Sequence, residues 1–298
     1  MTRLTRADLR NLEGSLAAYD NYLRDTTGHD LAGLALDAAG LPTDPHTRRG
    51  LADLHLGVVP ISIGLGLIGG FAQSVAAILD HLGCRSFVTE ATDVAGIAEA
   101  VARRPAAVFL SDDHDFLAMD PADGNAIHNT PATAQGFVAG LANMAHGLAD
   151  KKVLLLGCGP MGRAAAEALL ARGARLLLDD RLAERRDALK VHLLKRFKTH
   201  LGIDTVTDQS GIEADLIFDA TNTGDHIDLD RITNGSLVAA PGMPCGVTAA
   251  ARRVLGNRLL HDPLHIGVAT MAAKIFAAQA LAEPMRSRQS EIKECRCG

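Results

Sequence analysis

Two stretches of this chain carry the spacing Gly-x-Gly-x-x-Gly, each between an apolar run and a helix-like segment. The first is residues 64–69, after the apolar residues 58–63, and the second is residues 157–162, after residues 152–156. This spacing gives a tight turn, lets backbone N–H groups approach a pyrophosphate and lets the helix lie close to the strand. Two such units restrict the chain to the α/β class with parallel strands.

Strand-like and helix-like segments alternate along the chain, as a parallel α/β fold requires. We expect an N-terminal α/β substrate lobe (residues 1–149), a C-terminal Rossmann dinucleotide-binding lobe (residues 150–284) and a disordered tail (residues 285–298) after Pro284, which should end the last helix. The expected strands are residues 58–63, 85–90, 106–111, 152–156, 175–180, 216–220, 237–240 and 258–261. The expected helices are residues 9–23, 71–82, 94–102, 131–148, 161–172, 182–200 and 267–283.

The second glycine stretch is the better dinucleotide site. Its strand is uniformly apolar, as a central strand buried on both faces should be, whereas Pro60 interrupts the first strand. Asp180 stands about twenty residues on, where an acid holds the ribose of NAD and repels the 2′-phosphate of NADP. We therefore assign NAD to this lobe, and the first stretch to a wall of the substrate site or to a structural turn. The predicted cofactor contacts are Gly157, Gly159, Pro160, Met161, Gly162, Asp180, Arg181, Thr221 and Gly242.

Charge and composition exclude several classes of protein. The net charge of −5 and the 3% of aromatic residues predict no nucleic-acid partner, because both a basic surface and stacking platforms are lacking. We expect no membrane span and no secretory signal. Five cysteines, an odd number, favour a reducing compartment, so a cytoplasmic protein is expected. Cys295 and Cys297 lack partners for a zinc site in the polar tail, and a homodimer is left open.

Residues 111–124 read Ser-Asp-Asp-His-Asp-Phe-Leu-Ala-Met-Asp-Pro-Ala-Asp-Gly. The spacing fits neither a calcium loop nor a zinc site, so no metal is predicted. Asp120, Asp123 and Gly124 are typical of a solvated turn. Asp112 follows a strand end and is the candidate for holding a substrate ammonium, with Asn129 as a neutral hydrogen-bond partner. The alternative interpretation is a loop whose carboxylates are all solvated.

Five segments, taken together and in order, resemble the PylD family of pyrrolysine-biosynthesis dehydrogenases. They are residues 59–71, residues 112–118, residues 157–162, residues 241–245 and residues 262–267. The resemblance runs from about Leu4 to Ala273 and implies a dipeptide-like small-molecule substrate, 3-methylornithyl-N6-lysine. It implies that the terminal amine of this substrate is oxidised with NAD, and that cyclisation with loss of ammonia and water yields pyrrolysine.

The resemblance also implies roles for individual residues. It implies substrate contacts at Leu4, Thr5, Ser62, Asp112 and Asn129, and a cofactor contact at Ile266. Asp112 is the first choice for a catalytic general base. The chain departs from the family pattern at Ile63, Leu65, His114 and His265.

Two other classes of protein remain open. One is another NAD(P)-dependent dehydrogenase with an N-terminal substrate lobe, of the shikimate, methylene-tetrahydrofolate or amino-acid type. The first lobe shows no clear Lys–Asp catalytic pair, which argues against the shikimate type. The other is a non-catalytic NAD-binding regulator, which should carry a DNA-binding segment or a basic patch that the sequence does not show.

Overall fold

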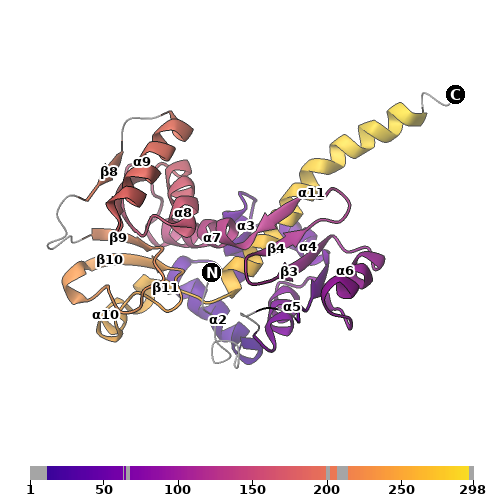
Figure 1. The fold of residues 1–298 in the computed structure, drawn as a ribbon, viewed down its shortest axis with the longest axis horizontal. Coiled ribbons are helices and arrows are strands. Elements are labelled where there is room, and N and C mark those ends of the chain that lie inside the picture. Colours follow the sequence, from indigo (N-terminus) through magenta and orange to yellow (C-terminus); the bar gives the residue numbers. More distant parts are fainter. Residues whose placement is uncertain (1–11, 63, 65–67, 199–201, 207–213, 295–298) are drawn as a thin grey trace.

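Each of the two glycine-containing βα units lies in its own sheet, and the two sheets belong to separate α/β lobes (Figure 1). The fold is that of a computed structural model, which describes residues 12–62, 64, 68–198, 202–206 and 214–294. Leu4, Thr5, Ile63, Leu65, Cys295 and Cys297 lie outside the described residues. The predicted fold class, α/β with two lobes, is confirmed.

The first lobe contains a five-stranded sheet in the order β2-β1-β3-β4-β5. Strands β1, β2 and β3 are parallel, whereas β4 and β5 run antiparallel to their neighbours. The strands are β1 (His55–Val59), β2 (Arg85–Val88), β3 (Ala107–Ser111), β4 (Phe116–Met119) and β5 (Ala126–His128). The helices are α2 (Leu12–Thr27), α3 (Leu31–Ala38), α4 (Pro45–Ala52), α5 (Phe71–His81) and α6 (Asp93–Ala102).

The second lobe contains a six-stranded parallel sheet in the order β11-β10-β9-β6-β7-β8. Counted from β6, this is the order 6-5-4-1-2-3 of a Rossmann sheet, whose direction reverses between β6 and β9. The strands are β6 (Lys152–Leu156), β7 (Arg175–Asp179), β8 (Ile203–Thr205), β9 (Ala214–Asp219), β10 (Ile232–Ala240) and β11 (Leu259–His261). The helices are α8 (Pro160–Ala171), α9 (Ala183–Phe197) and α10 (Ala249–Leu255), with 3-10 turns η1 (Leu229–Arg231) and η2 (Gly256–Arg258).

Strand β6 shows why an uninterrupted apolar run belongs in the centre of this sheet. Its side chains alternate between the two faces, so Val153 and Leu155 join one buried cluster while Leu154 and Leu156 join another. Helices α7 and α8 cover the first face and α10 covers the second. The sheet is therefore buried on both sides, as parallel sheets require.

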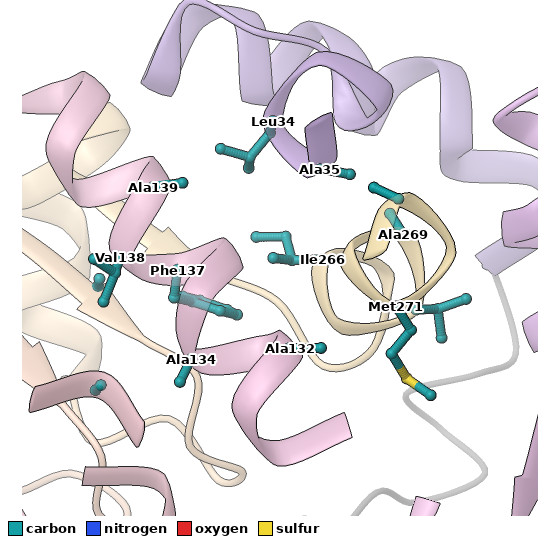
Figure 2. Packing of buried hydrophobic residues seen from close by; sticks show 14 of the residues in the cluster. Leu34, Ala35, Ala132, Ala134, Phe137, Val138, Ala139, Ile266, Ala269 and Met271 are labelled. Atoms are coloured by element: carbon teal, nitrogen blue, oxygen red, sulfur yellow. The ribbon is translucent and has the colours of Figure 1, made fainter. Parts of the chain in front are cut away.

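Two helices, α7 (Asn129–Met144) and α11 (His265–Glu294), connect the lobes. Helix α7 packs on α3 and α11 and also on α8, β10 and β11 of the second lobe. Figure 2 shows this core, with Phe137 on α7 and Ile266 on α11 among the buried residues. The lobe boundaries at residues 149, 150 and 284 remain predictions. Helix α11 follows the Rossmann sheet in the sequence, yet it packs mainly on elements of the first lobe, namely α3, α4, α5, β4 and β5.

The expectation that Pro284 ends the last helix is wrong, because α11 continues to Glu294 and extends away from both lobes (Figure 1). Residues 285–294, which we assigned to a disordered tail, are helical. Proline removes one helix hydrogen bond, and in an exposed stretch water can satisfy the freed carbonyl. Leu281, three residues before Pro284, is 77% exposed. The neighbouring Ala, Met, Arg, Gln and Glu residues also favour helix.

Most expected strands and helices are confirmed within a few residues, and the differences have local causes. The first strand is residues 55–59 rather than 58–63, because Pro60 ends it. Helix α4 lies in the region around residues 40–50, for which we predicted no helix or strand. Its N-cap Asp44 accepts from two backbone N–H groups and its first residue is Pro45. None of the helices in the described part of the chain is long and apolar enough to cross a membrane.

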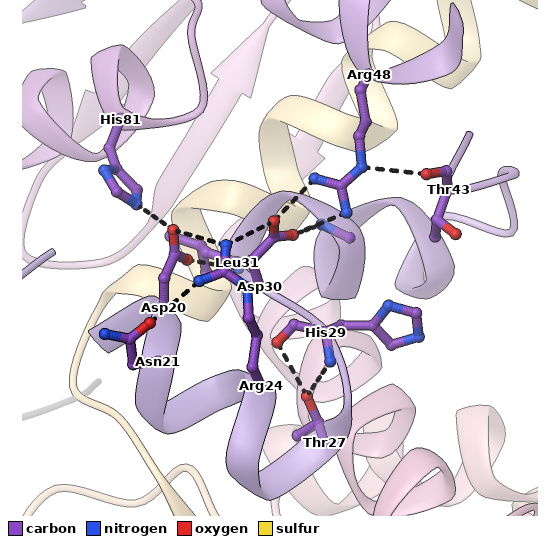
Figure 3. Close-up of polar contacts among 11 residues, drawn as sticks. Asp20, Asn21, Arg24, Thr27, His29, Asp30, Leu31, Thr43, Arg48 and His81 are labelled. Atoms are coloured by element: carbon purple, nitrogen blue, oxygen red, sulfur yellow. Dashed lines mark hydrogen bonds and ion pairs between the residues drawn. The ribbon is translucent and has the colours of Figure 1, made fainter. Parts of the chain in front are cut away.

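A polar network joins four helices at the base of the first lobe (Figure 3). The Asp30 carboxylate caps α3 by accepting from the Gly33 N–H at 2.8 Å, and it receives two hydrogen bonds from Arg48 at 2.9 and 3.0 Å. Arg24 adds a third cationic contact at 3.2 Å. Burial alone would raise the pKa of Asp30, but the Arg48 and Gly33 hydrogen bonds outweigh it and lower this pKa to about 2.

We predict that Asp30→Ala lowers the free energy of unfolding by about 1 to 2 kcal/mol at neutral pH, because it removes a helix cap and a paired carboxylate. Because the pKa of Asp30 is lower in the folded than in the unfolded protein, its carboxylate stabilises the fold at pH values above the unfolded-state pKa, near 3.8. This contribution is lost as the pH falls toward 2. Urea unfolding followed by circular dichroism should therefore show a smaller difference near pH 2. An equal difference at both pH values would contradict this role.

Candidate active site in the cleft between the lobes

A cleft of about 1460 Å³ lies between the lobes, at the carboxyl ends of β1 and β3 on one side and of β6, β7, β9 and β10 on the other. Both glycine-rich stretches reach it: Gly69 from the first, followed by Gly70, and Gly157 and Gly159 from the second. Ligands of open α/β sheets bind at this edge, where the strand order reverses. The cleft is therefore the candidate active site.

The second glycine stretch is shaped for an anion. A Cβ on Gly162 would lie 1.9 Å from the Gly157 carbonyl oxygen, so glycine at this position allows α8 to press against the end of β6. A Cβ on Gly159 would meet no atom within 4 Å, so the backbone there faces open space in the cleft. The N-terminus of α8 opens onto the same space through Pro160 and Met161. Unpaired N–H groups and the helix dipole make such a site favourable for phosphate.

Asp180 follows β7 and lines the cleft beside this loop. One carboxylate oxygen accepts from the Cys158 N–H at 2.7 Å and the other accepts from the Leu182 N–H at 2.8 Å. These bonds hold the carboxylate in place, and each oxygen keeps a second lone pair that could accept a ribose hydroxyl. Arg181 and Arg185 line the same wall.

Two loops complete the wall of the second lobe. Thr221 belongs to the loop after β9 and Gly242 to the loop after β10, and both line the cleft. A Cβ on Gly242 would lie 2.1 Å from the Thr221 carbonyl oxygen, so the loops touch and only glycine fits there. The same Thr221 lies against Gly157, where a Cβ would be 3.1 Å from its Cγ2 atom. The three loops therefore form one continuous surface.

The facing wall of the first lobe is acidic. Asp112, Asp113 and Asp115 line the cleft from the turn between β3 and β4. One oxygen of Asp112 accepts from the N–H groups of His114 and Asp115 at 2.7 and 2.8 Å, and these hydrogen bonds lower the pKa of Asp112. A carboxylate that keeps its charge attracts an ammonium but accepts protons poorly. The roles of Asp112 as a charge anchor and as a general base both remain predictions.

The remaining acids of residues 111–124 do not form a uniform solvated loop. Asp115 lies 2.6 Å from Nδ1 of His128, which pairs the two ends of the β4–β5 hairpin. Asp120 is 5% exposed and accepts from the Ala122 N–H at 2.8 Å, so the prediction that Asp120 is solvated is wrong. Its carboxylate stabilises the turn between β4 and β5 by accepting from a backbone N–H two residues on. Asp123 and Gly124 are exposed, as predicted.

The floor of the cleft is formed where α7 and α11 begin. Asn129 and Thr133 on α7 line it, and the amide oxygen of Asn129 accepts from the Thr133 hydroxyl at 3.1 Å. Gly267 on α11 lies against both, since a Cβ there would be 2.4 Å from the Thr133 oxygen and 2.6 Å from the Asn129 oxygen. Asn129 is thus held at the base of the acidic wall, within the same cleft as Asp112.

The structure gathers most of the predicted site residues in the cleft. They are Asp112, Asn129, Gly157, Gly159, Pro160, Met161, Asp180, Arg181, Thr221 and Gly242. Three others lie elsewhere in the structure. Ser62 lies outside the cleft lining and donates its backbone N–H to Asp93 at 2.9 Å. Ile266 is 1% exposed and packs against α7. Gly162 does not line the cleft and lies against Gly157 at the end of β6.

Sequence reasoning missed several polar residues of the cleft. Arg185, His226, Arg231 and Asp262 line it, and Asp219 lies buried at the end of β9 beside His226. Asp219 could have been noticed as a charged residue closing an apolar strand. His226 gives no such signal, because only the folding of the β9 loop brings it back to Asp219. Within the described ranges no group of three His, Cys, Asp or Glu side chains could hold a metal ion.

Known proteins resemble this chain in sequence and in fold. The profile described as "Pyrrolysine biosynthesis protein PylD, N-terminal domain" matches residues 8–127. A pyrrolysine synthase from Methanosarcina acetivorans is 32% identical over 276 residues, which is 93% of this chain and 100% of the relative. A pyrrolysine synthase from Methanosarcina barkeri is 30% identical over 93% of this chain and 98% of its own. Quinate dehydrogenase from Corynebacterium glutamicum, solved with NAD, shares the fold with a TM-score of 0.51 at 18% identity, covering 76% of this chain and 94% of that one.

We predict that Gly162→Ala lowers the free energy of unfolding by about 1 to 3 kcal/mol, because the added methyl group must displace α8 from the Gly157 carbonyl. Gly159→Ala is the matched control within the same loop, since its methyl group meets open space. Urea unfolding should separate the two variants. Equal stability of both would contradict the close contact between α8 and β6.

Proposed function

This chain belongs to the pyrrolysine synthase family, and from that premise we propose that it is an NAD-dependent amine dehydrogenase that forms pyrrolysine. One observation carries the proposal: an acidic wall of the first lobe faces a dinucleotide fingerprint of the second across a single cleft. The acidic wall suits an amine substrate and the fingerprint suits a pyridine dinucleotide. The family membership confirms the resemblance that the sequence motifs indicated.

The residues present fit NAD. Gly159 leaves space for a pyrophosphate at the start of α8, and Gly162 holds that helix against β6. Asp180 is fixed by two N–H groups and keeps capacity for ribose hydroxyls. Thr221 and Gly242 form the surface that continues from the fingerprint toward the acidic wall. When bound, NAD⁺ accepts the hydride from the carbon that carries the substrate amine.

The proposed substrate is 3-methylornithyl-N6-lysine, whose ornithyl part carries two amines. Asp112 holds one of them as an ammonium through its charge, and Asn129 offers hydrogen bonds from the cleft floor. The first lobe thereby positions the terminal carbon toward the second lobe. Hydride transfer needs such positioning more than it needs a nucleophile from the protein.

Oxidation converts the terminal carbon–nitrogen single bond into an imine, with loss of one hydride and one proton. The α-amine nitrogen of the same substrate then attacks the imine carbon, the original nitrogen leaves as ammonia, and the ring C=N bond forms. If the imine is first hydrolysed to an aldehyde, the water taken up is released when the ring closes. Holding the amine and the electrophilic carbon close together in one cleft promotes this closure.

The proposal extends to the surroundings of the enzyme. The described cysteines Cys84, Cys158 and Cys245 are free thiols, which supports a reducing compartment such as the cytoplasm. The substrate lobe at residues 1–149 and the cofactor lobe from residue 150 are proposed units of the fold. A homodimer is also proposed, and light scattering coupled to gel filtration would test it.

Incubation of the protein with NAD⁺ and 3-methylornithyl-N6-lysine tests the proposal. We expect NADH absorbance to rise and a product to form whose mass is lower by ammonia and two hydrogen atoms. Asp112→Asn should lower kcat/KM about tenfold or more, because a charge-assisted hydrogen bond to the substrate is lost, while NADH binding is kept. Asp123→Asn is the control, since Asp123 is exposed and does not line the cleft. Absence of NADH formation, or NADH without release of ammonia, would contradict the proposed reaction.

We predict that Asp180→Ala lowers the preference for NAD⁺ over NADP⁺ about tenfold, which corresponds to about 1.4 kcal/mol. The variant removes the carboxylate that would repel a 2′-phosphate and leaves Arg181 and Arg185 on the same wall. Asp187→Ala, an exposed carboxylate of α9 outside the cleft lining, is the control. The ratio of kcat/KM for the two cofactors is the measurement, and an unchanged ratio would exclude the ribose role.

A further inference from the structure

The loops after β9 and β10 are joined by backbone hydrogen bonds around one residue, Gly246. The N–H groups of His226 and Ile227 both donate to its carbonyl oxygen, at 2.7 and 2.8 Å. The Thr248 N–H then donates to the Ile227 carbonyl at 2.9 Å. These hydrogen bonds therefore hold together the two loops that face the cofactor side of the cleft, as one unit.

A buried carboxyl group lies inside this unit. Asp219 ends β9 and is 0% exposed, and its Oδ1 atom accepts from the Thr221 N–H at 3.1 Å. Its Oδ2 atom has no hydrogen-bond partner within the described part of the chain. A Cβ on Gly246 would lie 2.0 Å from this oxygen, so the second loop is pressed against it. A buried carboxyl with an unsatisfied oxygen is costly unless a cation compensates it.

His226 is placed to compensate the buried carboxyl group. Its Nδ1 atom lies 2.9 Å from the Thr223 carbonyl oxygen, to which it must donate. Its Nε2 atom lies 3.4 Å from both the Asp219 Oδ1 atom and the Thr221 hydroxyl. The nearby Asp219 carboxylate raises the pKa of His226, against the opposing effect of burial. When both ring nitrogens are protonated, Nδ1 donates to the Thr223 carbonyl and Nε2 faces the Asp219 carboxylate. The ring then holds the loop of residues 219–226 in its folded conformation.

We propose that the pair of His226 and Asp219 is a positioning device for the dinucleotide, in which the protonated imidazole holds the loop of Thr221 against the cofactor. The proposal rests on the proposed function, because it requires the dinucleotide to bind at Gly157–Gly162. Thr221, Asn222 and Thr223 all line the cleft, and Thr221 lies against Gly157 of the fingerprint. When the imidazole loses a proton, Nε2 becomes an acceptor that faces the Asp219 carboxyl oxygen. The attraction between the ring and Asp219 is then lost, and the loop of Thr221 is no longer held.

Other charged groups near the pair decide how the proton responds to pH. Asp219 faces His226 from β9 and favours the proton, whereas Arg231 faces it from η1 and disfavours it. Asp225 and Arg252 form an exposed pair 3.8 Å apart on the outer side of the same loops. The Asp219 contact is the largest effect on the pKa of His226, so the protonated form is favoured above the usual value of 6.5.

Titration of NADH fluorescence at a series of pH values tests this role, and the chain contains no Trp to interfere. Because the pKa of His226 is raised, wild-type protein should keep its NADH affinity to a pH above the usual value of 6.5. It should lose that affinity as the pH rises further and the imidazole loses its proton. His226→Gln should bind NADH about tenfold more weakly at low pH, because one hydrogen bond to a charged group is lost, and its affinity should no longer fall over this range. The effect should be found in KM for NAD⁺ and not in kcat.

His81→Gln is the matched control. His81 pairs with Asp20 at 2.9 Å in the first lobe, and its side chain is 23% exposed, close to the 24% of His226. This variant should keep the wild-type affinity and pH profile, because the pair lies away from the cleft lining. Loss of the pH dependence in this control as well would contradict the assignment to His226.

Asp219→Asn supplies a second variant, which keeps the shape of the buried side chain. Removal of the contact that raises the pKa of His226 should move the midpoint of NADH binding to lower pH. Thermal unfolding without cofactor gives an independent readout. Because the pKa of His226 is raised in the folded protein, its protonation contributes fully to the free energy of unfolding below about pH 6.5. This contribution is lost as the pH rises through the pKa of the folded state. The stability difference between wild type and His226→Gln should therefore shrink as the pH rises.

The possible results separate the two proposals. Failure of the wild-type protein to bind NADH at any pH would overturn the proposed function, and this inference with it. Normal NADH binding with identical affinities and pH profiles for wild type and His226→Gln would overturn only the positioning role. An unmoved midpoint in Asp219→Asn would also overturn it, because the pair would then not control the proton.

Discussion

The close approach of α7 to α11 and β11 is the contact on which the rest of the structure depends. A Cβ on Gly136 would lie 2.3 Å from Ile266 and 2.7 Å from Thr270, and a Cβ on Gly140 would lie 2.2 Å from Leu260. Glycine at these positions lets helix α7 press against α11 and against β11 of the second sheet. Figure 2 shows the packing of α7 beside α11. Such tight packing holds both sheets at a fixed separation, since close-packed interiors deform little. The cleft is the space left above this contact.

The separation of charge across the cleft follows from this arrangement. The first lobe contributes carboxylates from the β3–β4 turn, led by Asp112, whereas the second contributes three arginines beside the carboxylates of Asp180 and Asp262. The arginines are Arg181, Arg185 and Arg231. The first wall therefore attracts a cationic substrate, and the arginines of the second wall attract the phosphates of an anionic dinucleotide. Because hydride transfer requires the two to meet at their reacting ends, the division of charge also orients them.

The sequence predicts the parts of the fold that depend on local pattern. The βα alternation is correct, and residues 157–162 lead from β6 into α8 as predicted, because periodicity and glycine spacing are local. Strands β4 and β5 were missed because each is too short to show alternation, and α11 passes Pro284 because an exposed helix tolerates the lost bond. Asp112 and Asn129 were found from their places at a strand end and a helix start. The pairing of His226 with Asp219 was not, because seven residues of irregular loop determine it.

A crystal structure of the protein with NADH tests the central claim, that the cofactor occupies the cleft from the second lobe. The account predicts the pyrophosphate at the N-terminus of α8, against Gly159, with the adenosine ribose at Asp180 and the nicotinamide facing the wall of Asp112. A pyrophosphate at the glycine-rich stretch before α5, beside Gly69 and Gly70, would contradict it. In that case the roles of the two lobes would be reversed.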